Sequence, residues 1–199
     1  GCHVLCEKPM ALNAEEARRM LVAAQKADRR IMINFSYRFT EQSWALKRQV
    51  ESGILGEVYF ARTVWHRRRG LPGFGCCFGQ KALSGGGPLI DLGVHRLDLA
   101  LWLMGYPRPV WVMGSIYDSI GSALARECGA AFDVEDMAVG LVRVGDGAAL
   151  EIGASWGGDF REAGVVGARV FGKKGGVVEG NVEGDLRVEG EVYLGRGGG

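Results

Sequence analysis

Asp91 and His95 carry side chains that can exchange protons, and they lie four residues apart in a segment with helical spacing. On an α-helix this spacing places both side chains on one face, within reach of a hydrogen bond. A carboxylate that accepts from one imidazole nitrogen fixes the tautomer and leaves the other nitrogen free to take or give a proton. The pattern predicts a general acid or base, although a core histidine satisfied by an aspartate has the same spacing. Asp98 is expected to be structural, as a second brace or as the partner of an arginine.

Lys8 is a second kind of candidate, a cation placed at the end of a strand. The segment Glu7-Lys8-Pro9 directly follows an apolar run, Cys2 to Cys6, which predicts a buried strand. The carboxyl ends of strands form the edge at which open α/β sheets bind ligands, and Pro9 restricts the turn that follows. A catalytic cation is expected there, but a lysine at a strand end is more often a solvated surface residue.

The elements that must position these residues follow two patterns. In the first third, Asn13 predicts the start of a helix, with Glu16 three residues later; residues 31–35 predict a strand, and residues 41–52 a helix that ends at Gly53. Strand, helix, strand, helix is the order of a parallel α/β sheet.

From residue 57 onward the apolar pattern has mostly a period of two. It predicts strands at 58–65, 110–117, 137–144, 148–156, 168–171, 177–179 and 186–193. Asp146-Gly147 predicts a tight hairpin turn, and no long helix separates the later strands, so this sheet is expected to be mainly antiparallel. A single long helix, residues 88–104, supplies an apolar stripe to cover one of its faces.

The composition excludes several classes of protein. The 199 residues include 24 Lys and Arg against 23 Asp and Glu, so there is no charge excess to attract nucleic acid or an anionic membrane surface. No apolar run reaches the roughly 20 residues of a membrane helix. Five cysteines, an odd number without framework spacing, indicate reduced thiols. We expect a cytoplasmic protein whose partner is a small molecule.

A metal site at Cys2, His3 and Cys6 is the competing interpretation of the first strand. Four extended residues at about 3.3 Å each separate the two thiols by roughly 13 Å, too far for one zinc ion. We therefore expect no metal, and core thiols instead.

Four segments carry a resemblance along most of the chain: HVLCEKPMA at 3–11, NFSYRF at 34–39, GILGEV at 53–58 and SGGGPLIDLGVHRLDLALWLMG at 84–105. They resemble the Gfo/Idh/MocA family of sugar and polyol oxidoreductases. The resemblance implies an α/β protein in which residues 1–36 are the remnant of a parallel Rossmann sheet. Residues 37–199 would be an α+β substrate domain, truncated at its C-terminus, with an open, largely antiparallel sheet packed on a long helix.

The resemblance also implies a site. Lys8, Asp91 and His95 would be catalytic in a reaction that interconverts a secondary alcohol and a ketone on a sugar or polyol. Glu7, Lys8, Pro9 and Arg38 would contact NAD or NADP, and the substrate would meet Tyr37, Trp65, Arg67, Asp91 and His95. The chain holds no G-x-G-x-x-G loop after a strand, so by itself it is expected to be inactive.

Three expectations complete the sequence reading. The run Arg67 to Arg69 leads into a long glycine-rich loop, residues 70–79, of the kind that covers a pocket, although three arginines also suit a solvated strand end. The uncovered sheet face is expected to join copies of the chain into a homo-oligomer.

The chain opens with Gly1 in a strand and closes on Gly195 to Gly199, which suggests a fragment. The alternative is a binding or assembly module that kept the fold without activity.

Overall fold

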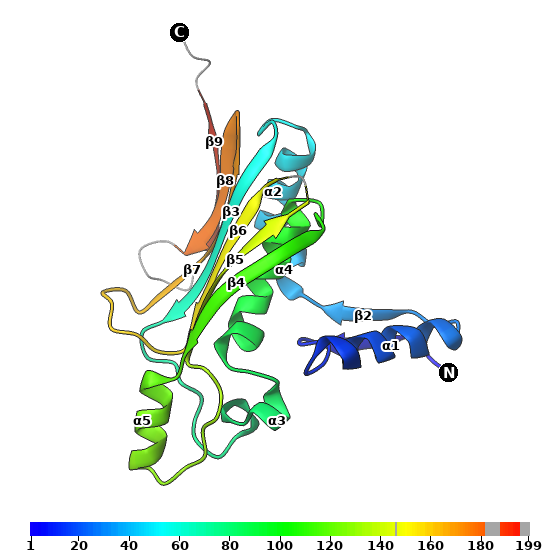
Figure 1. Ribbon diagram of the computed structural model, residues 1–199. Coiled ribbons are helices and arrows are strands. Elements are labelled where there is room, and N and C mark those ends of the chain that lie inside the picture. The colour runs from blue at the N-terminus through cyan, green and yellow to red at the C-terminus, as the bar shows by residue number, and fades with distance from the viewer. Residues whose placement is uncertain (146, 182–187, 196–199) are drawn as a thin grey trace.

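The computed structural model describes residues 1–145, 147–181 and 188–195. Within these ranges the strands form two sheets, which we call the small sheet and the large sheet. Figure 1 shows the tall large sheet with helices α2 and α4 along one side, and the N-terminal unit projecting away from it. The predicted α/β class, a small parallel sheet followed by a larger and mostly antiparallel one, is confirmed.

The small sheet consists of β1 (Val4–Glu7) and β2 (Ile31–Asn34), paired in parallel and joined by helix α1 (Ala14–Lys26). The helix begins as predicted, because the side chain of Asn13 accepts a hydrogen bond from the Glu16 amide at 2.9 Å. The prediction that β1 is buried is wrong: Val4 is 49% exposed and Leu5 69%. Among the described residues β1 pairs only with β2, in a sheet of two strands that leaves these apolar side chains accessible to solvent.

The two cysteines of this region, Cys2 before β1 and Cys6 within it, differ from the prediction for the same reason. Cys2 is exposed and Cys6 is only half-buried, and both are free thiols rather than core residues.

After β2 the chain makes a short 3-10 turn, η1 (Ser36–Phe39), and enters α2 (Glu41–Glu51). Thr40 starts α2, since its hydroxyl accepts from the Ser43 amide. The helix stops before Gly53, whose φ of +76° lies in the region that favours glycine.

The large sheet has the order β4-β5-β6-β3-β7-β8-β9 within the described ranges. The pairing of β3 with β6 is parallel and the other neighbours are antiparallel. The bounds are β3 (Val58–Arg67), β4 (Pro109–Tyr117), β5 (Met137–Val144), β6 (Ala149–Ser155), β7 (Gly164–Gly172), β8 (Gly175–Asn181) and β9 (Val188–Leu194).

Two details of the predicted strands concern residues outside the described ranges. The hairpin between β5 and β6 forms as predicted, with Gly147 at φ +95°, but Asp146 lies outside those ranges. The same is true of the first two residues of the strand predicted at 186–193, and of residues 196–199 in the predicted glycine tail.

The long helix that packs on the large sheet begins with a π-helical turn, η3 (Leu89–Gly93), and continues as α4 (Val94–Leu103). Leu99, Ala100 and Leu103 are 0–1% exposed and pack in one core cluster with Leu150 and Val170 of the sheet. The predicted span was correct, but the π-helical start was not predicted. π-Helical turns often occur at functional sites.

Two other helices lie in the connections. α3 (Lys81–Ser84) is a single turn that follows a 3-10 turn, η2 (Cys77–Gly79), and α5 (Ser119–Glu127) follows β4. We did not predict α5, because it is short and holds a glycine; the buried carboxylate of Asp136 stabilises its start by accepting from the amides of Ile120 and Gly121 at 2.7 and 2.6 Å.

The face of the large sheet opposite α4, which we call the open face, carries exposed apolar side chains. Trp111 is 46% exposed, Met113 62%, Tyr117 50% and Val139 39%. The register places these four residues in the opposite phase to the buried Leu150 and Ala138. None of the helices in the described part of the chain is long and apolar enough to cross a membrane.

Candidate active site

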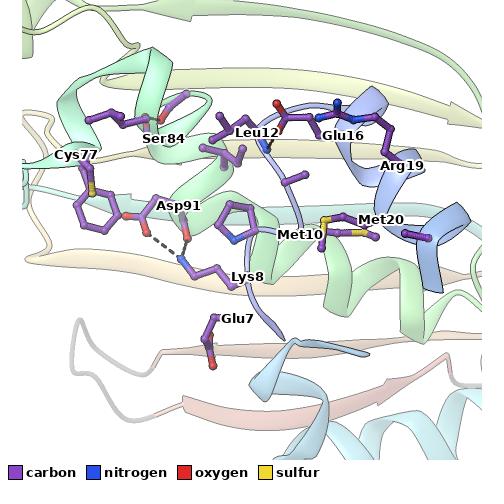
Figure 2. Close-up of a pocket in the computed structure, with 17 residues that line it drawn as sticks. Glu7, Lys8, Met10, Leu12, Glu16, Arg19, Met20, Cys77, Ser84 and Asp91 are labelled. Carbon is purple, nitrogen blue, oxygen red and sulfur yellow. Dashed lines mark hydrogen bonds and ion pairs between the residues drawn. The ribbon is translucent and has the colours of Figure 1, made fainter. Parts of the chain in front are cut away.

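Lys8 and Asp91 form an ion pair between the end of β1 and the π-helical turn (Figure 2). The Lys8 ammonium donates to the Asp91 carboxylate at 2.9 Å and to its backbone carbonyl at 2.6 Å. Their side chains are 18% and 17% exposed, so the pair is largely shielded from solvent. Lys8 is therefore not the solvated surface residue that was the alternative to a catalytic cation.

A close contact between two loops sets this geometry. A methyl group added at Gly85 would lie 2.8 Å from the Leu12 carbonyl oxygen, and one added at Gly87 would lie 1.9 Å from the Glu135 carbonyl oxygen. Glycine at position 85 therefore lets the loop after Lys8 rest on the segment that leads into Asp91, and glycine at position 87 lets that segment approach the backbone of Glu135. Gly85 also has a φ of +82°.

Asp91 does not brace His95, contrary to the prediction. Its second carboxylate oxygen accepts from the indole Nε1 of the buried Trp156 at 2.9 Å, and its first is bound to Lys8. The spacing rule that led to the prediction holds for an α-helix, whereas Asp91 lies in the π-helical turn and His95 in the α-helix that follows.

His95 packs against two aromatic rings. Its Nδ1 atom is buried and has no hydrogen-bond partner within the described part of the chain. The imidazole lies edge-on to Tyr37, with ring centroids 5.2 Å apart, and is tilted against Trp65 at 5.7 Å. These contacts bring together three of the predicted site residues from η1, β3 and α4.

The environment of His95 keeps its imidazole neutral at neutral pH. Burial, together with the positive charges of Lys8 and Arg96, lowers its pKa from 6.5 to about 4. The carboxylates of Asp91 and Glu7 oppose this effect but do not cancel it. A neutral imidazole can accept a proton.

Arg38 lies at a different place from the Lys8–Asp91 pair. Its guanidinium forms two hydrogen bonds to the Asp98 carboxylate, which raise the pKa of Arg38, and it stacks over the rings of Phe35 and Tyr106 at 5.3 Å each. Asp98 thus has the expected structural role as the partner of an arginine.

A cavity of about 1020 Å³ adjoins the Lys8–Asp91 pair (Figure 2). Glu7 and Pro9 line it as well, and its wall is mainly apolar, with Met10, Leu12, Met20 and Ile90 among the lining residues. The Glu7 carboxylate accepts a hydrogen bond from Asn34 at 2.6 Å.

The glycine-rich loop contributes to this cavity through Cys77 and Phe78, in keeping with the prediction that it covers a pocket. The three arginines before it divide in their roles. Arg67 is half-buried and lies over the Trp65 ring at 5.8 Å, whereas Arg69 is paired with Asp159 at the surface, with side chains 71% and 82% exposed. Arg69 therefore fits the interpretation of these arginines as a solvated strand end.

Sequence reasoning missed several residues of this site. Trp156 holds Asp91, and Arg96, directly after His95, lies 4.2 Å from the Tyr37 ring centroid. Arg96 pairs with Glu179 of β8 at 2.8 Å, both 1% exposed. A charged residue at a position where the pattern expects an apolar one was the available signal. Arg96 lies on the buried stripe of the helix, and Glu179 comes two residues after the buried Val177, on the same face of its strand.

Two family models match the chain, and curated relatives resemble most of it. A family model described as the GFO/IDH/MocA C-terminal domain matches residues 44–178, and one described as an oxidoreductase family with an NAD-binding Rossmann fold matches residues 1–35. The D-glucoside 3-dehydrogenase of Escherichia coli (strain K12) is 37% identical over 183 residues, which cover 88% of this chain and 51% of that protein. The myo-inositol 2-dehydrogenase of Thermotoga maritima is 32% identical, over 90% of this chain and 50% of that protein.

A solved structure is also similar to this chain. The aldose-aldose oxidoreductase from Caulobacter crescentus, complexed with glycerol, has a TM-score of 0.79 and 26% identity and covers 96% of this chain and 53% of its own. The chain spans about half the length of these relatives. The family model over most of the chain and the identity to the E. coli protein show that the chain belongs to the Gfo/Idh/MocA family.

Proposed function

We propose that this chain provides the catalytic, substrate-binding half of an NAD(P)-dependent oxidoreductase that interconverts a secondary alcohol and a ketone on a sugar or polyol. The observation that carries the proposal is the shielded Lys8–Asp91 pair at the edge of a cavity of about 1020 Å³. The charges of both residues act on the pKa of the neutral His95. Family membership supports it, since relatives are named for glucoside and inositol dehydrogenation.

Each of the three residues has a chemical task in this proposal. Oxidation of a secondary alcohol removes a proton from the hydroxyl group and a hydride from its carbon. When bound, a nicotinamide cofactor supplies the hydride acceptor. The His95 imidazole takes the hydroxyl proton, and the Lys8 ammonium donates a hydrogen bond to the oxygen as negative charge develops on it. Asp91 orients Lys8, and reduction reverses these roles.

The residues present fit one end of the cofactor. The apolar wall beside Lys8 suits a flat nicotinamide ring, and Glu7, Lys8 and Pro9 would contact it. The chain has no glycine-rich strand-turn-helix for the pyrophosphate. We propose that this site lies in the half of the relatives' length that the chain does not span. Arg38 is proposed as a further cofactor contact, from its partly exposed position in η1, the turn that follows β2.

The remaining assignments extend this proposal. The substrate would meet Tyr37, Trp65 and Arg67, whose side chains adjoin His95 or one another. Residues 1–36 would belong to the dinucleotide-binding domain, and residues 37–199 to the substrate domain. Free thiols support a cytoplasmic location, and the exposed apolar residues of the open face support a homo-oligomer.

The experiment uses the full-length protein that carries this chain, with NAD and NADP and a panel of glucosides, hexoses and inositols. We expect cofactor reduction with at least one of these substrates. If no member of the panel is oxidised while the protein still binds the cofactor, the substrate class is wrong. If the folded protein binds neither cofactor, the binding or assembly module without activity is the better account.

A further inference from the structure

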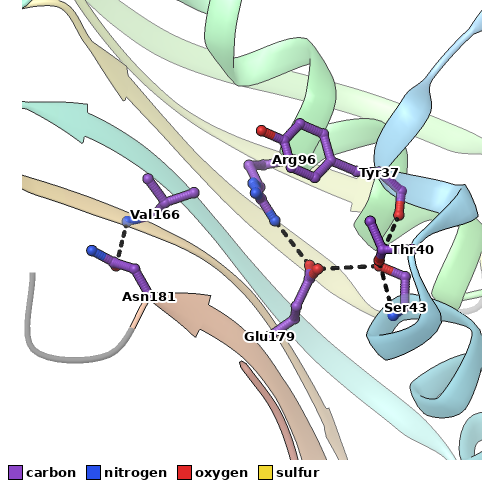
Figure 3. Close-up of polar contacts among 7 residues, drawn as sticks. All are labelled: Tyr37, Thr40, Ser43, Arg96, Val166, Glu179 and Asn181. Carbon is purple, nitrogen blue, oxygen red and sulfur yellow. Dashed lines mark hydrogen bonds and ion pairs between the residues drawn. The ribbon is translucent and has the colours of Figure 1, made fainter. Parts of the chain in front are cut away.

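A buried ion pair between Arg96, the residue after His95, and Glu179 lies outside the set of residues that line the cavity beside Lys8. Arg96 and Glu179 are each 1% exposed, and their charged groups are 2.8 Å apart. Figure 3 shows Arg96, Glu179 and Ser43 converging from α4, β8 and α2. The Ser43 hydroxyl donates to the second Glu179 oxygen at 3.1 Å and receives a hydrogen bond from Thr40 at 2.8 Å. Three elements of the fold therefore meet at Glu179.

The guanidinium of Arg96 uses its remaining surface on aromatic rings. It lies 4.2 Å from the centroid of Tyr37 and 5.2 Å from that of Trp65. Its Nε and one terminal nitrogen are buried and have no hydrogen-bond partner within the described residues. Buried donors without partners cost stability, so we do not explain this ion pair by a gain in stability.

The two rings that Arg96 contacts are the two rings that contact His95. Tyr37 and Trp65 lie 5.7 Å apart, and each packs on the imidazole at 5.2 and 5.7 Å. The buried Nδ1 of His95 has no hydrogen-bond partner among the residues that the structure describes, and the Asp91 carboxylate is bound to Lys8 and Trp156. Ring packing is therefore what fixes the orientation of the imidazole.

We propose that the Arg96–Glu179 ion pair is a positioning device, which holds Tyr37 and Trp65 against His95 and so sets the orientation of the imidazole. The inference rests on the proposed function of His95. Arg96 and Glu179 act as positioning residues and do not touch the substrate.

The charges around His95 provide a readout. Lys8 and Arg96 face it with positive charge, Asp91 and Glu7 with negative charge, and the Tyr37 phenol packs on it. Burial and the two cations lower the His95 pKa. Burial raises the pKa of Glu179, and its ion pair with Arg96 opposes this effect.

The test compares two variants with a matched control. The double variant Arg96→Met, Glu179→Gln removes both charges and keeps the side-chain volumes close to the originals. Arg96→Lys keeps the positive charge but loses the planar stacking group. The control, Arg62→Met with Glu151→Gln, removes the same charges from an exposed pair on the open face, 3.1 Å apart.

The first readout is the NMR titration of ¹³C-labelled histidine in the protein, which needs no activity. In the double variant the His95 pKa should rise, and the ring-current shifts from Tyr37 and Trp65 should be lost. In Arg96→Lys the pKa should stay low while the ring-current shifts change. The control should leave the His95 signals as they are, while the pKa of His66, which Arg62 lowers, should rise.

The second readout is steady-state kinetics of the full-length protein, where we expect kcat to fall roughly 10- to 100-fold in Arg96→Lys with the cofactor KM unchanged. Unchanged His95 signals in a folded Arg96→Lys variant would overturn the positioning device even if the double variant does not fold. Changed signals without loss of kcat would uphold the device and instead count against the catalytic role of His95.

Discussion

The Asp91 carboxylate lies against the Lys8 ammonium at 2.9 Å and has no hydrogen bond to His95. This relationship changes how the three proposed catalytic residues depend on one another. Asp91 is bonded to Lys8 and Trp156, whereas His95 packs separately against Tyr37 and Trp65.

A double-mutant cycle in the full-length protein tests the first dependence. Lys8→Met and Asp91→Asn should each lower kcat, and the double variant should be little worse than Lys8→Met alone, because Asp91 serves to hold Lys8. Asp91→Asn combined with His95→Ala should be closer to additive. Full additivity of the Lys8 and Asp91 effects would show that the ion pair is not a functional unit.

The stability of the protein should depend on pH through His95. Its folded pKa of about 4 lies below the ordinary 6.5, so below pH 6.5 the unfolded chain binds a proton that the folded chain does not. The free energy of unfolding should fall as the pH decreases from about 6.5 to about 4. His95→Gln should make this part of the profile less steep, measured by urea unfolding at a series of pH values. His3→Gln, at an exposed position, is the control.

Burial lowers the pKa of His66 as well, so His66 contributes to the same slope. The His95→Gln profile should therefore be shallower than that of the wild type without becoming flat. An identical slope in both proteins would mean that His95 is not buried in a neutral form.

The open face should mediate self-association. Trp111 and Met113 are 46% and 62% exposed at an edge of the large sheet, where large apolar side chains favour contact with another copy. Trp111→Lys with Met113→Glu should lower the average mass measured by light scattering. The control is Leu21→Lys, at an exposed position on α1. A wild-type protein that is folded and monomeric at high micromolar concentration would contradict this prediction.

The chain by itself should not bind NADH measurably, because it lacks the glycine-rich loop whose backbone amides hold the pyrophosphate. The measurement is a fluorescence titration of the folded chain, with the full-length protein as the positive control. Saturable binding at micromolar NADH to the chain alone would show that the cavity beside Lys8 is sufficient for the cofactor.

Much of the fold could be predicted from the sequence, because local signals were strong. The Asn13 cap, the stop at Gly53 and the alternating strands each depend on neighbours close in the chain, and the structure confirms them. The exposure of β1 could not be predicted, since an apolar run reports what a strand is suited to pack against and not whether that layer is present.

The candidate site was only partly predictable for a related reason. Residue types and spacing indicated Lys8, Asp91 and His95, but not which of them are bonded. The π-helical turn at Leu89–Gly93 turns Asp91 toward Lys8, and no simple periodicity signals such a turn. Trp156, directly after β6, binds Asp91, and Glu179 of β8 binds Arg96; both lie far from their partners in the sequence, so only the tertiary structure shows these contacts.

The catalytic role of His95 is the central claim, and kcat of His95→Ala at saturating cofactor in the full-length protein tests it most directly. The account predicts a fall of roughly 10²- to 10⁴-fold with nearly unchanged cofactor affinity, because the proton acceptor is lost while the cofactor contacts remain. A kcat within a few-fold of the wild type, together with a loss of thermal stability, would show that His95 is a core histidine and would contradict the account.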